Sequence, residues 1–390
     1  MMITLAIAGK PNCGKSTFFK AATLAHVEIA NYPFTTIDAN HGVAYVRATC
    51  PCRELEVACP HCRNGVRFIP IGLIDVAGLV PEAHKGRGLG NQFLDNLRQA
   101  DAILHVVDAS GGTDAEGNPV DVGSHNPEGD IAFLRYEMTM WVYGILGKHW
   151  PKLQRQAQQR DFSLLLAIVD VFAGLGVTLE DVKAAEAAID TDLRQASEEA
   201  LITFCGHLVA ASKPMEIVAN KADLAPAEFL ENLKQYGVIF SSAAGELALR
   251  MAAEGKYLHY LPGDTEFTIN SDAPFTAAQR AGIMKIADFM KQFGGTGVQQ
   301  ALDRAVFDLL DMIVVYPVED EHKLTDGQGR VLPDAFLMKR GSTPHDLAYQ
   351  VHTDIGDGFL YAIDARKNMR IKETHELQHG DIIKIVSVRK

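Results

Sequence analysis

The sequence lacks an uninterrupted apolar stretch long enough to cross a membrane, which argues against a membrane-spanning protein. The apolar residues at its start are interrupted by Gly9 and Lys10, and no cationic segment precedes them, so we expect no secretory signal. Cysteine is also scarce, because six residues in 390 are too few for a disulfide scaffold. Together these absences predict a cytoplasmic protein with no membrane partner.

Positive charge is in short supply as well. The chain has 37 Lys and Arg against 49 Asp and Glu, a formal net charge of −12. A surface of this sign excludes indiscriminate binding to nucleic acid but is compatible with a local basic patch. The residues that are present include 47% hydrophobic and 22% charged side chains, an ordinary globular composition. The length predicts about two to three domains.

A phosphate-binding loop stands near the N-terminus. Residues 9–16 read GKPNCGKS, after the apolar run 3–8 and before a helix-compatible segment. This strand–loop–helix order is the context that the motif requires, since backbone N–H groups then converge on phosphate at a positive helix end. We expect Lys15 to reach the β- and γ-phosphates and Ser16 to ligate Mg²⁺. The expected phosphate-binding residues are Gly9, Asn12, Cys13, Gly14, Lys15, Ser16 and Thr17.

Two further segments predict contacts to Mg²⁺ and the γ-phosphate. Asp75 ends an apolar strand, where a carboxylate suits a water-mediated hold on Mg²⁺, and the Gly78 N–H suits a close approach to the γ-phosphate. Thr36, preferred over Thr35, lies between the first helix and the second strand. We expect Thr36 to be the switch residue that senses the γ-phosphate through Mg²⁺.

A guanine-recognition motif follows a later apolar strand. It comprises Asn220, Lys221 and Asp223. The Asp223 carboxylate can accept hydrogen bonds from both the N1–H and the 2-amino group of guanine, which adenine does not offer. We expect Asn220 to brace the neighbouring loops and the Lys221 stem to cover the base. Ser242 and Ala243 end the next strand, where the Ala243 N–H is expected to meet the guanine oxygen.

Four of the six cysteines lie within 13 residues, in the pattern CxC–x6–CxxC. Two tight turns of this kind can bring four thiolates to one tetrahedral centre, the geometry that Zn²⁺ prefers. We therefore predict a structural zinc site, with His61 as an alternative ligand. Exposed reduced thiols or a redox switch remain competing interpretations. The candidate ligands are Cys50, Cys52, Cys59 and Cys62.

Strand-like and helix-compatible segments alternate, as in a doubly wound α/β domain. Strands are predicted at 42–47, 66–75, 102–107, 214–219 and 237–241. A helical insertion is predicted between residues 108 and 213, with helices at 131–143, 151–166 and 179–202 and Thr178 as an N-cap. A helix at 298–312 then leads to a small α+β domain, with strands at 313–317, 335–338, 359–364 and 382–388 and a helix at 344–352.

The motifs as a set resemble a known family. Residues 31–37 (NYPFTTI), 75–80 (DVAGLV) and 86–93 (GRGLGNQF) resemble the Obg-related translation-factor GTPases, and residues 341–348 (GSTPHDLA) resemble the start of a TGS-domain helix. The resemblance is to the YchF-like layout and covers essentially the whole chain. It implies an α/β fold: a P-loop GTPase domain in two parts (1–110 and 212–297), a helical insertion (111–211) and a linker helix with a β-grasp TGS domain (298–390).

The predicted chemistry is slow GTP hydrolysis. Leu79 stands where many switch GTPases carry a glutamine that orients water, so Lys15, Asn12 and Thr36 are the remaining catalytic candidates. The resemblance implies that Asn12 helps to hold K⁺ between the phosphates, while a local loop hydrogen bond is the alternative. His84 is a further candidate to approach a water, although it is more simply a solvated loop residue.

We expect a nucleotide-gated switch that binds GTP and GDP and acts on ribosomes or translation. Many YchF relatives lack the guanine motif and prefer ATP, so an ATP-preferring or dual-specificity NTPase is one alternative. A redox- or zinc-responsive binding protein is another. Ribosomal RNA contacts are predicted through the TGS-like domain and the helical arm, against the alternative of an ordinary amphipathic helix. The arm residues concerned are Arg135, Lys148, Lys152, Arg155 and Arg160, with Trp141 and Trp150.

Overall fold

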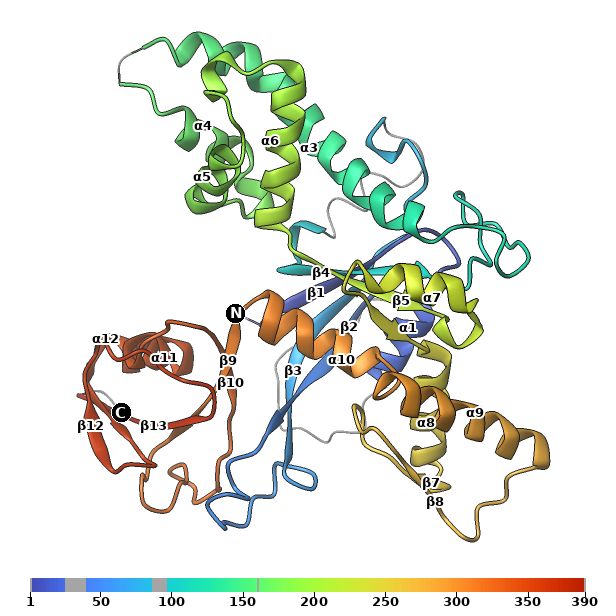
Figure 1. Cartoon of the computed structure of the whole chain (residues 1–390). Coiled ribbons are helices and arrows are strands. Elements are labelled where there is room, and N and C mark those ends of the chain that lie inside the picture. Colours follow the sequence, from blue (N-terminus) through green and yellow to red (C-terminus); the bar gives the residue numbers. More distant parts are fainter. Residues whose placement is uncertain (1, 25–39, 86–96, 160, 389–390) are drawn as a thin grey trace.

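The computed structural model describes residues 2–24, 40–85, 97–159 and 161–388, and a six-stranded sheet lies at its centre (Figure 1). The sheet order is β2-β3-β1-β4-β5-β6, with β2 antiparallel to β3 and the other neighbours parallel. Its strands are β1 (Thr4–Ala8), β2 (His41–Thr49), β3 (Val66–Asp75), β4 (Ala102–Asp108), β5 (Met215–Asn220) and β6 (Ile239–Ser241). All seven residues of β4 are buried, as expected of a parallel strand covered on both faces.

Alternate residues of β1 enter two different cores. Leu5 and Ile7 pack with Phe18 of α1 (Lys15–Thr23) and with Leu302 of α10 (Val298–Asp303). Ala6 and Ala8 belong to the core that the helical insertion shares. The two-residue period of a strand thus distributes its side chains between two helical layers, which confirms the predicted α/β fold class.

The described residues of the insertion between β4 and β5 contain four α-helices: α3 (Glu128–Gln156), α4 (Leu164–Val171), α5 (Leu179–Ala187) and α6 (Glu198–Ser212). The predicted helix 151–166 is wrong, because α3 continues through Pro151 and ends before α4. The predicted helix 179–202 is also wrong as one element. Ser197 caps a new helix by accepting from Ala200 N, which separates α5 from α6. The predicted N-cap Thr178 is confirmed, in a capping box with Asp181.

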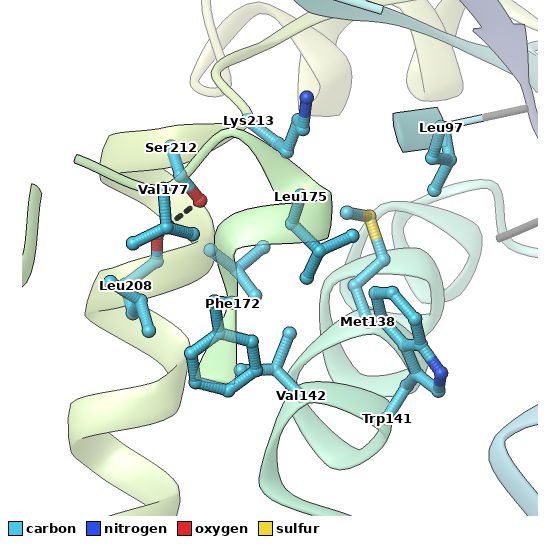
Figure 2. A pocket seen from close by; sticks show the side chains of 11 residues that line it. Leu97, Met138, Trp141, Val142, Phe172, Leu175, Val177, Leu208, Ser212 and Lys213 are labelled. Atoms are coloured by element: carbon cyan, nitrogen blue, oxygen red, sulfur yellow. Dashed lines mark hydrogen bonds between the residues drawn. The ribbon is translucent and has the colours of Figure 1, made fainter. Parts of the chain in front are cut away.

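An apolar pocket inside the insertion is a packing gap (Figure 2). Its volume is about 10 Å³, room for about one water molecule. Met138, Trp141 and Phe172 are among the residues that line it, and Trp150 is buried nearby in the same hydrophobic core. Both tryptophans therefore serve the core of the insertion, as the amphipathic-helix alternative expects.

The chain returns from the insertion through β5 to the remaining helices of the first domain. These are α7 (Ala227–Lys234), α8 (Ala243–Glu254) and α9 (Ala277–Phe293), with a short hairpin of β7 (Leu258–His259) and β8 (Thr268–Ile269) between the last two. The predicted helix 298–312 is shorter than expected. It comprises α10 and a π-helical turn at Arg304–Leu309, because Met312 already belongs to the next strand.

A five-stranded sheet, in the order β10-β9-β13-β11-β12, forms the C-terminal domain. Strand β13 pairs parallel with β9, and the helices lie against the sheet, which is a β-grasp arrangement (Figure 1). Its elements are β9 (Met312–Val318), β10 (Phe336–Lys339), α11 (Pro344–Val351), α12 (Thr353–Asp357), β11 (Phe359–Asp364), β12 (Met369–Ile371) and β13 (Asp381–Ser387). Among the described residues, no helix has the length and apolar character to span a bilayer.

Candidate nucleotide-binding site

The loop between β1 and α1 has the conformation that phosphate binding requires. Gly14, the N-cap of α1, has φ 100°, and a Cβ there would lie 2.2 Å from the Asn220 amide nitrogen, so only glycine fits. Lys15 is 7% exposed, and its ammonium donates to the carbonyls of Gly9 (3.0 Å) and Lys10 (2.8 Å). Thr17 lies half-buried in the first turn of α1. The loop therefore holds a cation beside the N-terminus of a helix.

The predicted Mg²⁺ ligands Ser16 and Asp75 lie together. The Ser16 hydroxyl donates to the Asp75 carboxylate at 2.8 Å, across 59 residues of sequence. Hydroxyl and carboxylate oxygens are hard ligands, so this pair fits Mg²⁺. Gly78 is close enough to the loop that a Cβ would lie 2.8 Å from the Pro11 ring. Thr36 lies outside the described residues, as do the motifs at 31–37 and 86–93.

Asn220 joins the phosphate loop to the predicted base-recognition loops. Its amide nitrogen donates to the Cys13 carbonyl (3.0 Å), and its amide oxygen accepts from Ala243 N (3.0 Å). Asp223 lies exposed in the turn that follows β5, and Ser242 caps α8 by accepting from Gly245 N. One side chain thus holds three segments at the carboxyl ends of neighbouring strands, the edge where open α/β sheets bind ligands.

Asn12 of the phosphate loop and Lys221 of the turn after β5 each contact another loop, which the sequence did not predict. Lys221 donates to the Asn12 carbonyl and to Asp108, each at 2.8 Å. The Asn12 side chain donates to the Gly117 carbonyl at 2.9 Å, in the loop after β4 and 105 residues away in the sequence, rather than within its own loop. This bond engages Nδ2 and not Oδ1, the atom that would coordinate K⁺.

Burial controls the ionisation of two groups beside the phosphate loop. Cys13 is fully buried, and burial raises the pKa of its thiol, so the reactive thiolate is disfavoured. Burial, with Arg135 and Lys15 nearby, lowers the pKa of His105 to about 3, so this β4 imidazole is neutral at ordinary pH. Neither group supplies a charge to the site.

Neither Leu79 nor His84 is placed to orient a water molecule. Leu79 is 4% exposed and belongs to the core shared with the helical insertion. The His84 imidazole contacts the Glu137 carboxylate at 2.7 Å, and Glu137 also accepts from the backbone N–H groups of Glu82 and His84. Within residues 75–85, which the structure describes, the Leu79 side chain thus lies in the core and the His84 side chain is held against α3.

Sequence reasoning missed the buried charges that surround the loop. Lys10 pairs with Asp130 of α3 at 2.6 Å, and both side chains are less than 10% exposed. Asp108 is fully buried and accepts from Ser110, Thr113 and Lys221. An acidic residue ending the apolar strand β4, as Asp75 ends β3, was a signal for Asp108. No comparable signal links Lys10 to Asp130.

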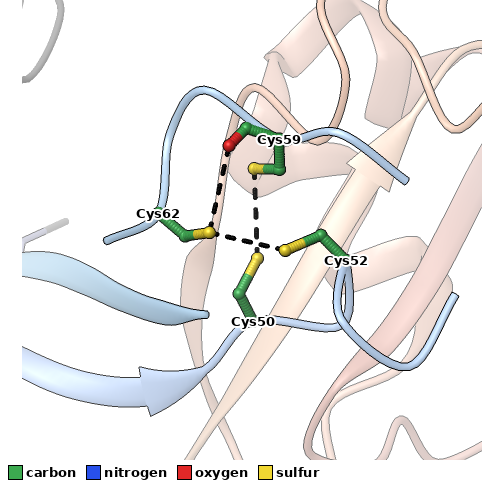
Figure 3. Close-up of side chains that lie close together, drawn as sticks. All are labelled: Cys50, Cys52, Cys59 and Cys62. Atoms are coloured by element: carbon green, nitrogen blue, oxygen red, sulfur yellow. Dashed lines mark hydrogen bonds between the residues drawn. The ribbon is translucent and has the colours of Figure 1, made fainter. Parts of the chain in front are cut away.

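The four clustered cysteines come together at the far end of β2 and β3 (Figure 3). Their sulfur atoms all lie within 4.8 Å of one another, as a metal site requires. His61 is not a member of this group, so it does not replace a sulfur in the arrangement observed. The cluster is separate from the nucleotide site.

The basic residues of the two proposed RNA-binding segments differ in their surroundings. Arg135, Lys148, Lys152 and Arg155 are exposed along α3, and Arg160 lies outside the described residues. In the C-terminal domain, Arg340 pairs with Asp311, Arg366 with Glu54 and Lys367 with Asp364, while the Arg370 guanidinium lies over the Tyr361 ring. Lys339 and Lys372 of the C-terminal domain are exposed as well, so both segments present basic side chains at the surface.

Three protein families match successive parts of the chain. Residues 4–128 match the family described as 50S ribosome-binding GTPase. Residues 218–320 match an Obg-like GTPase family, YGR210-like, described as a G4 motif-containing domain. Residues 322–387 match the TGS domain. The order agrees with the two sheets and the insertion between β4 and β5.

Full-length relatives extend these matches. An uncharacterized GTP-binding protein of Methanocaldococcus jannaschii is 50% identical over 398 residues, with 100% of both chains covered. The ribosome-binding ATPase YchF of Bacillus subtilis is 30% identical, over 93% of this chain and 88% of its own. A crystal structure of a GTP-binding protein from Pyrococcus horikoshii aligns with a TM-score of 0.77 and 41% identity, over 99% of this chain and 100% of that one.

Proposed function

The chain belongs to the YchF-like, Obg-related GTPases, and from this premise we propose that it binds GTP with Mg²⁺, hydrolyses it slowly to GDP and phosphate, and acts as a nucleotide-gated switch on ribosomes. The observation that carries the proposal is the position of Asn220. By bonding to Cys13 and Ala243, it fixes the Asp223 turn beside the phosphate loop. A purine bound at this edge meets a carboxylate that recognises guanine.

The base-recognition motif favours guanine in this chain, whereas the Bacillus relative is named an ATPase. This chain carries both Lys221 and Asp223, and the family that matches residues 218–320 is described by its G4 motif. A carboxylate facing adenine would find one hydrogen-bond donor, the 6-amino group, at a different place on the ring. Such a mismatch costs about 1–3 kcal/mol for each unpaired buried group, which favours GTP.

Competitive titration of a fluorescent GDP analogue with GTP and with ATP tests this specificity. We expect GTP to compete at least about tenfold better than ATP, since 1.4 kcal/mol corresponds to tenfold. The Asp223→Asn variant should lose that preference and gain affinity for xanthosine triphosphate, because an amide can donate to the extra oxygen of xanthine. Asp272→Asn, at another exposed aspartate, is the matched control. Equal or tighter ATP binding by the wild type would refute the guanine assignment.

The phosphate chemistry rests on the loop and its Mg²⁺ ligands. Ser16 and Asp75 would hold Mg²⁺, with Thr36 as the proposed third residue, and the ion would neutralise phosphate charge when bound. Lys15 would exchange its two loop carbonyls for phosphate oxygens and stabilise the negative charge there. Because Leu79 is in the core and His84 is bound to Glu137, we infer a low intrinsic rate.

K⁺ is the proposed accelerator, with the Asn12 amide oxygen as its protein ligand. The hydrogen bond from Nδ2 to Gly117 orients the amide. Hydrolysis rates in matched K⁺ and Na⁺ buffers decide the question, with Asn12→Ala as the variant that should abolish any difference. Equal rates in the two buffers would remove K⁺ from the proposal.

The ribosome is the proposed partner because relatives are named for it and because a TGS domain is present. The exposed basic residues of α3 offer a surface that can contact RNA phosphates. Co-sedimentation with ribosomal subunits should be stronger with a GTP analogue than with GDP. Equally weak sedimentation in both states would contradict the switch.

A further inference from the structure

We propose that Cys50, Cys52, Cys59 and Cys62 bind one structural Zn²⁺ and that this zinc site fixes the C-terminal domain against the GTPase domain. The four thiols come from the loop that connects β2 to β3, and their side chains converge on a common centre (Figure 3). This inference does not depend on which nucleotide the protein binds.

The sulfur positions fit a tetrahedral ion. The Cys50 and Cys59 sulfurs are 4.0 Å apart and those of Cys52 and Cys62 are 3.4 Å apart. With Zn–S bonds of about 2.3 Å, the edge of a regular tetrahedron is about 3.8 Å, which lies between these two values. All four cysteines are free thiols, and Cys50 and Cys52 are buried. Four protein ligands complete the coordination, so the site is closed and structural rather than catalytic.

A buried arginine beside the cluster is a second, independent observation. Arg67 of β3 is 5% exposed, and its guanidinium lies 3.8 Å from the Cys59 sulfur. In the described part of the chain, its other contacts are two carbonyl oxygens and the Tyr316 ring, with no carboxylate among them. A buried cation requires a counter-charge. Zn²⁺ with four thiolates carries a net charge of −2 and would supply it.

The same arginine reaches the C-terminal domain. Its guanidinium donates to the carbonyls of Leu332 (2.9 Å) and Pro333 (2.7 Å), in the segment between β9 and β10. From β9, the Tyr316 hydroxyl donates to the Thr49 carbonyl, immediately before Cys50. Cys50 and Cys52 share one hydrophobic core with Tyr316, Leu324 and Leu332. The loop that carries the thiols therefore lies in the contact between the two domains (Figure 1).

Zinc is needed at this contact because the loop has little regular structure of its own. Its backbone hydrogen bonds include Leu55 N to the Pro51 carbonyl and Val57 N to the Cys52 carbonyl, and no strand or helix covers residues 50–62. A metal ion would hold Cys50, Cys52 and Arg67 in the positions that pack against β9. Without it, no ion would hold the four cysteine side chains together beside the guanidinium, and we expect the C-terminal domain to detach.

Metal content tests the site itself. Protein purified under reducing conditions should contain about one zinc per chain. Replacement of zinc by Co²⁺ should give the strong visible absorption of a tetrahedral thiolate site. The Cys59→Ser/Cys62→Ser variant should lose both signals, and Cys205→Ala, at a cysteine buried in α6, should keep them. Wild-type protein without metal, with iron, or with zinc that survives the double substitution would overturn the site.

Hydrogen exchange tests whether the zinc site fixes the contact between the two domains. On removal of zinc by a chelator, amides of 313–318 and 331–335 should exchange at least about tenfold faster. Affinity for GDP should stay within about twofold, which shows that the nucleotide domain remains folded. Arg67→Ala should keep zinc and still accelerate exchange at 331–335. Unchanged exchange in zinc-free protein and in Arg67→Ala would refute the proposal that zinc fixes the domain contact, and the zinc site would then lack this role.

Discussion

At the nucleotide site, single residues act through partners far away in the chain. Asn220 bonds to Cys13, 207 residues away in the sequence, and to Ala243, 23 residues away, and Lys10 pairs with Asp130 of α3. The role of Asn220 could be predicted because its motif has a fixed place at a strand end. The role of Lys10 could not, because a lysine in this loop has no intrinsic preference for one buried partner. Long-range ion pairs depend on the packing of α3, which no local pattern specifies.

Asp303 provides a residue-scale prediction about pH. Its Oδ1 accepts from Arg47 N (2.8 Å) and from Gln299 Nε2 (2.9 Å), and burial raises the pKa of the carboxyl to about 7. An unfolded aspartate has a pKa of about 3.9, so the folded state binds the extra proton between these values. The proton on Asp303 therefore stabilises the folded state fully below about pH 4, and this stabilisation is lost as the pH rises through about 7.

Asp303→Asn should remove this pH dependence. The amide oxygen can keep both hydrogen bonds, and the amide carries no charge to bury. We expect the variant to be more stable than the wild type by about 1–2 kcal/mol at pH 8 and equally stable at pH 4. This difference is smaller than the full pKa shift would give, because Asp303 is partly exposed and solvent screens its charge. Urea unfolding at both pH values measures this, with Asp288→Asn on α9 as the control. Parallel pH profiles for wild type and variant would contradict the assignment.

At the scale of elements, most strands were predicted, but the short strands β7, β8 and β12 and the bounds of two insertion helices were not. Strands β3 and β11 have the predicted bounds because their apolar runs end at turn residues. Helix α3 continues through Pro151, although proline usually ends a helix. The residue four positions earlier is the exposed Gly147, whose carbonyl can turn to water, and Trp150 and Leu153 anchor the last turns in the core. Tertiary packing outweighs the local signal there.

Helix α3 also offers an element-scale prediction about coupling. Glu137 accepts three hydrogen bonds from Glu82 and His84, which lie four and six residues after the predicted γ-phosphate contact Gly78. Glu137→Gln retains one acceptor oxygen but places its amide N–H group against the N–H donors of Glu82 and His84. We expect this to weaken the contact by about 2–3 kcal/mol. Hydrogen exchange at 82–85 should rise by about tenfold or more. Any exchange difference in α3 between the GTP-analogue and GDP states should shrink.

Glu128→Gln is the matched control, since Glu128 lies on the same helix and contacts Asn126 and Gln235 instead. It should leave exchange at 82–85 unchanged. If Glu137→Gln behaves like this control, α3 does not transmit the nucleotide state to the insertion.

The loop after β4 provides a second prediction at this scale. Gly117 has φ +86°, and a Cβ there would lie 2.6 Å from the Pro11 carbonyl oxygen. Gly117→Ala should push the loop away from the phosphate loop, break the Asn12 bond and weaken GDP binding about tenfold through lost preorganisation. Gly123→Ala has similar backbone strain at φ +85° but meets only the Pro226 ring at 3.5 Å. Equal GDP affinities for the two variants would exclude a role for this contact.

At the scale of the whole molecule, the sequence predicted the order of the domains but not how they meet. The resemblance of residues 341–348 to a TGS helix was sufficient to identify the C-terminal sheet, because the motif is local. The contact between the domains joins Arg67 to residues more than 260 positions away. The cysteine spacing indicated a metal site, yet nothing in the spacing placed that site at an interface.

Two arginines cross this interface, and they should differ sharply in their effect on thermal unfolding. Arg366 pairs with Glu54 at 2.6 Å, but the Glu54 side chain is 67% exposed, so solvent screens the pair and its contribution is about 0–1 kcal/mol. Arg67 is buried, and Arg67→Ala leaves the Leu332 and Pro333 carbonyls without donors. This should lower the stability of the domain contact by about 2–4 kcal/mol. Calorimetry should therefore show nearly wild-type unfolding for Arg366→Ala and a separate, earlier transition of the C-terminal domain for Arg67→Ala. Equal effects of the two substitutions would mean that exposed charges, rather than the buried contact beside the cysteines, hold the domains together.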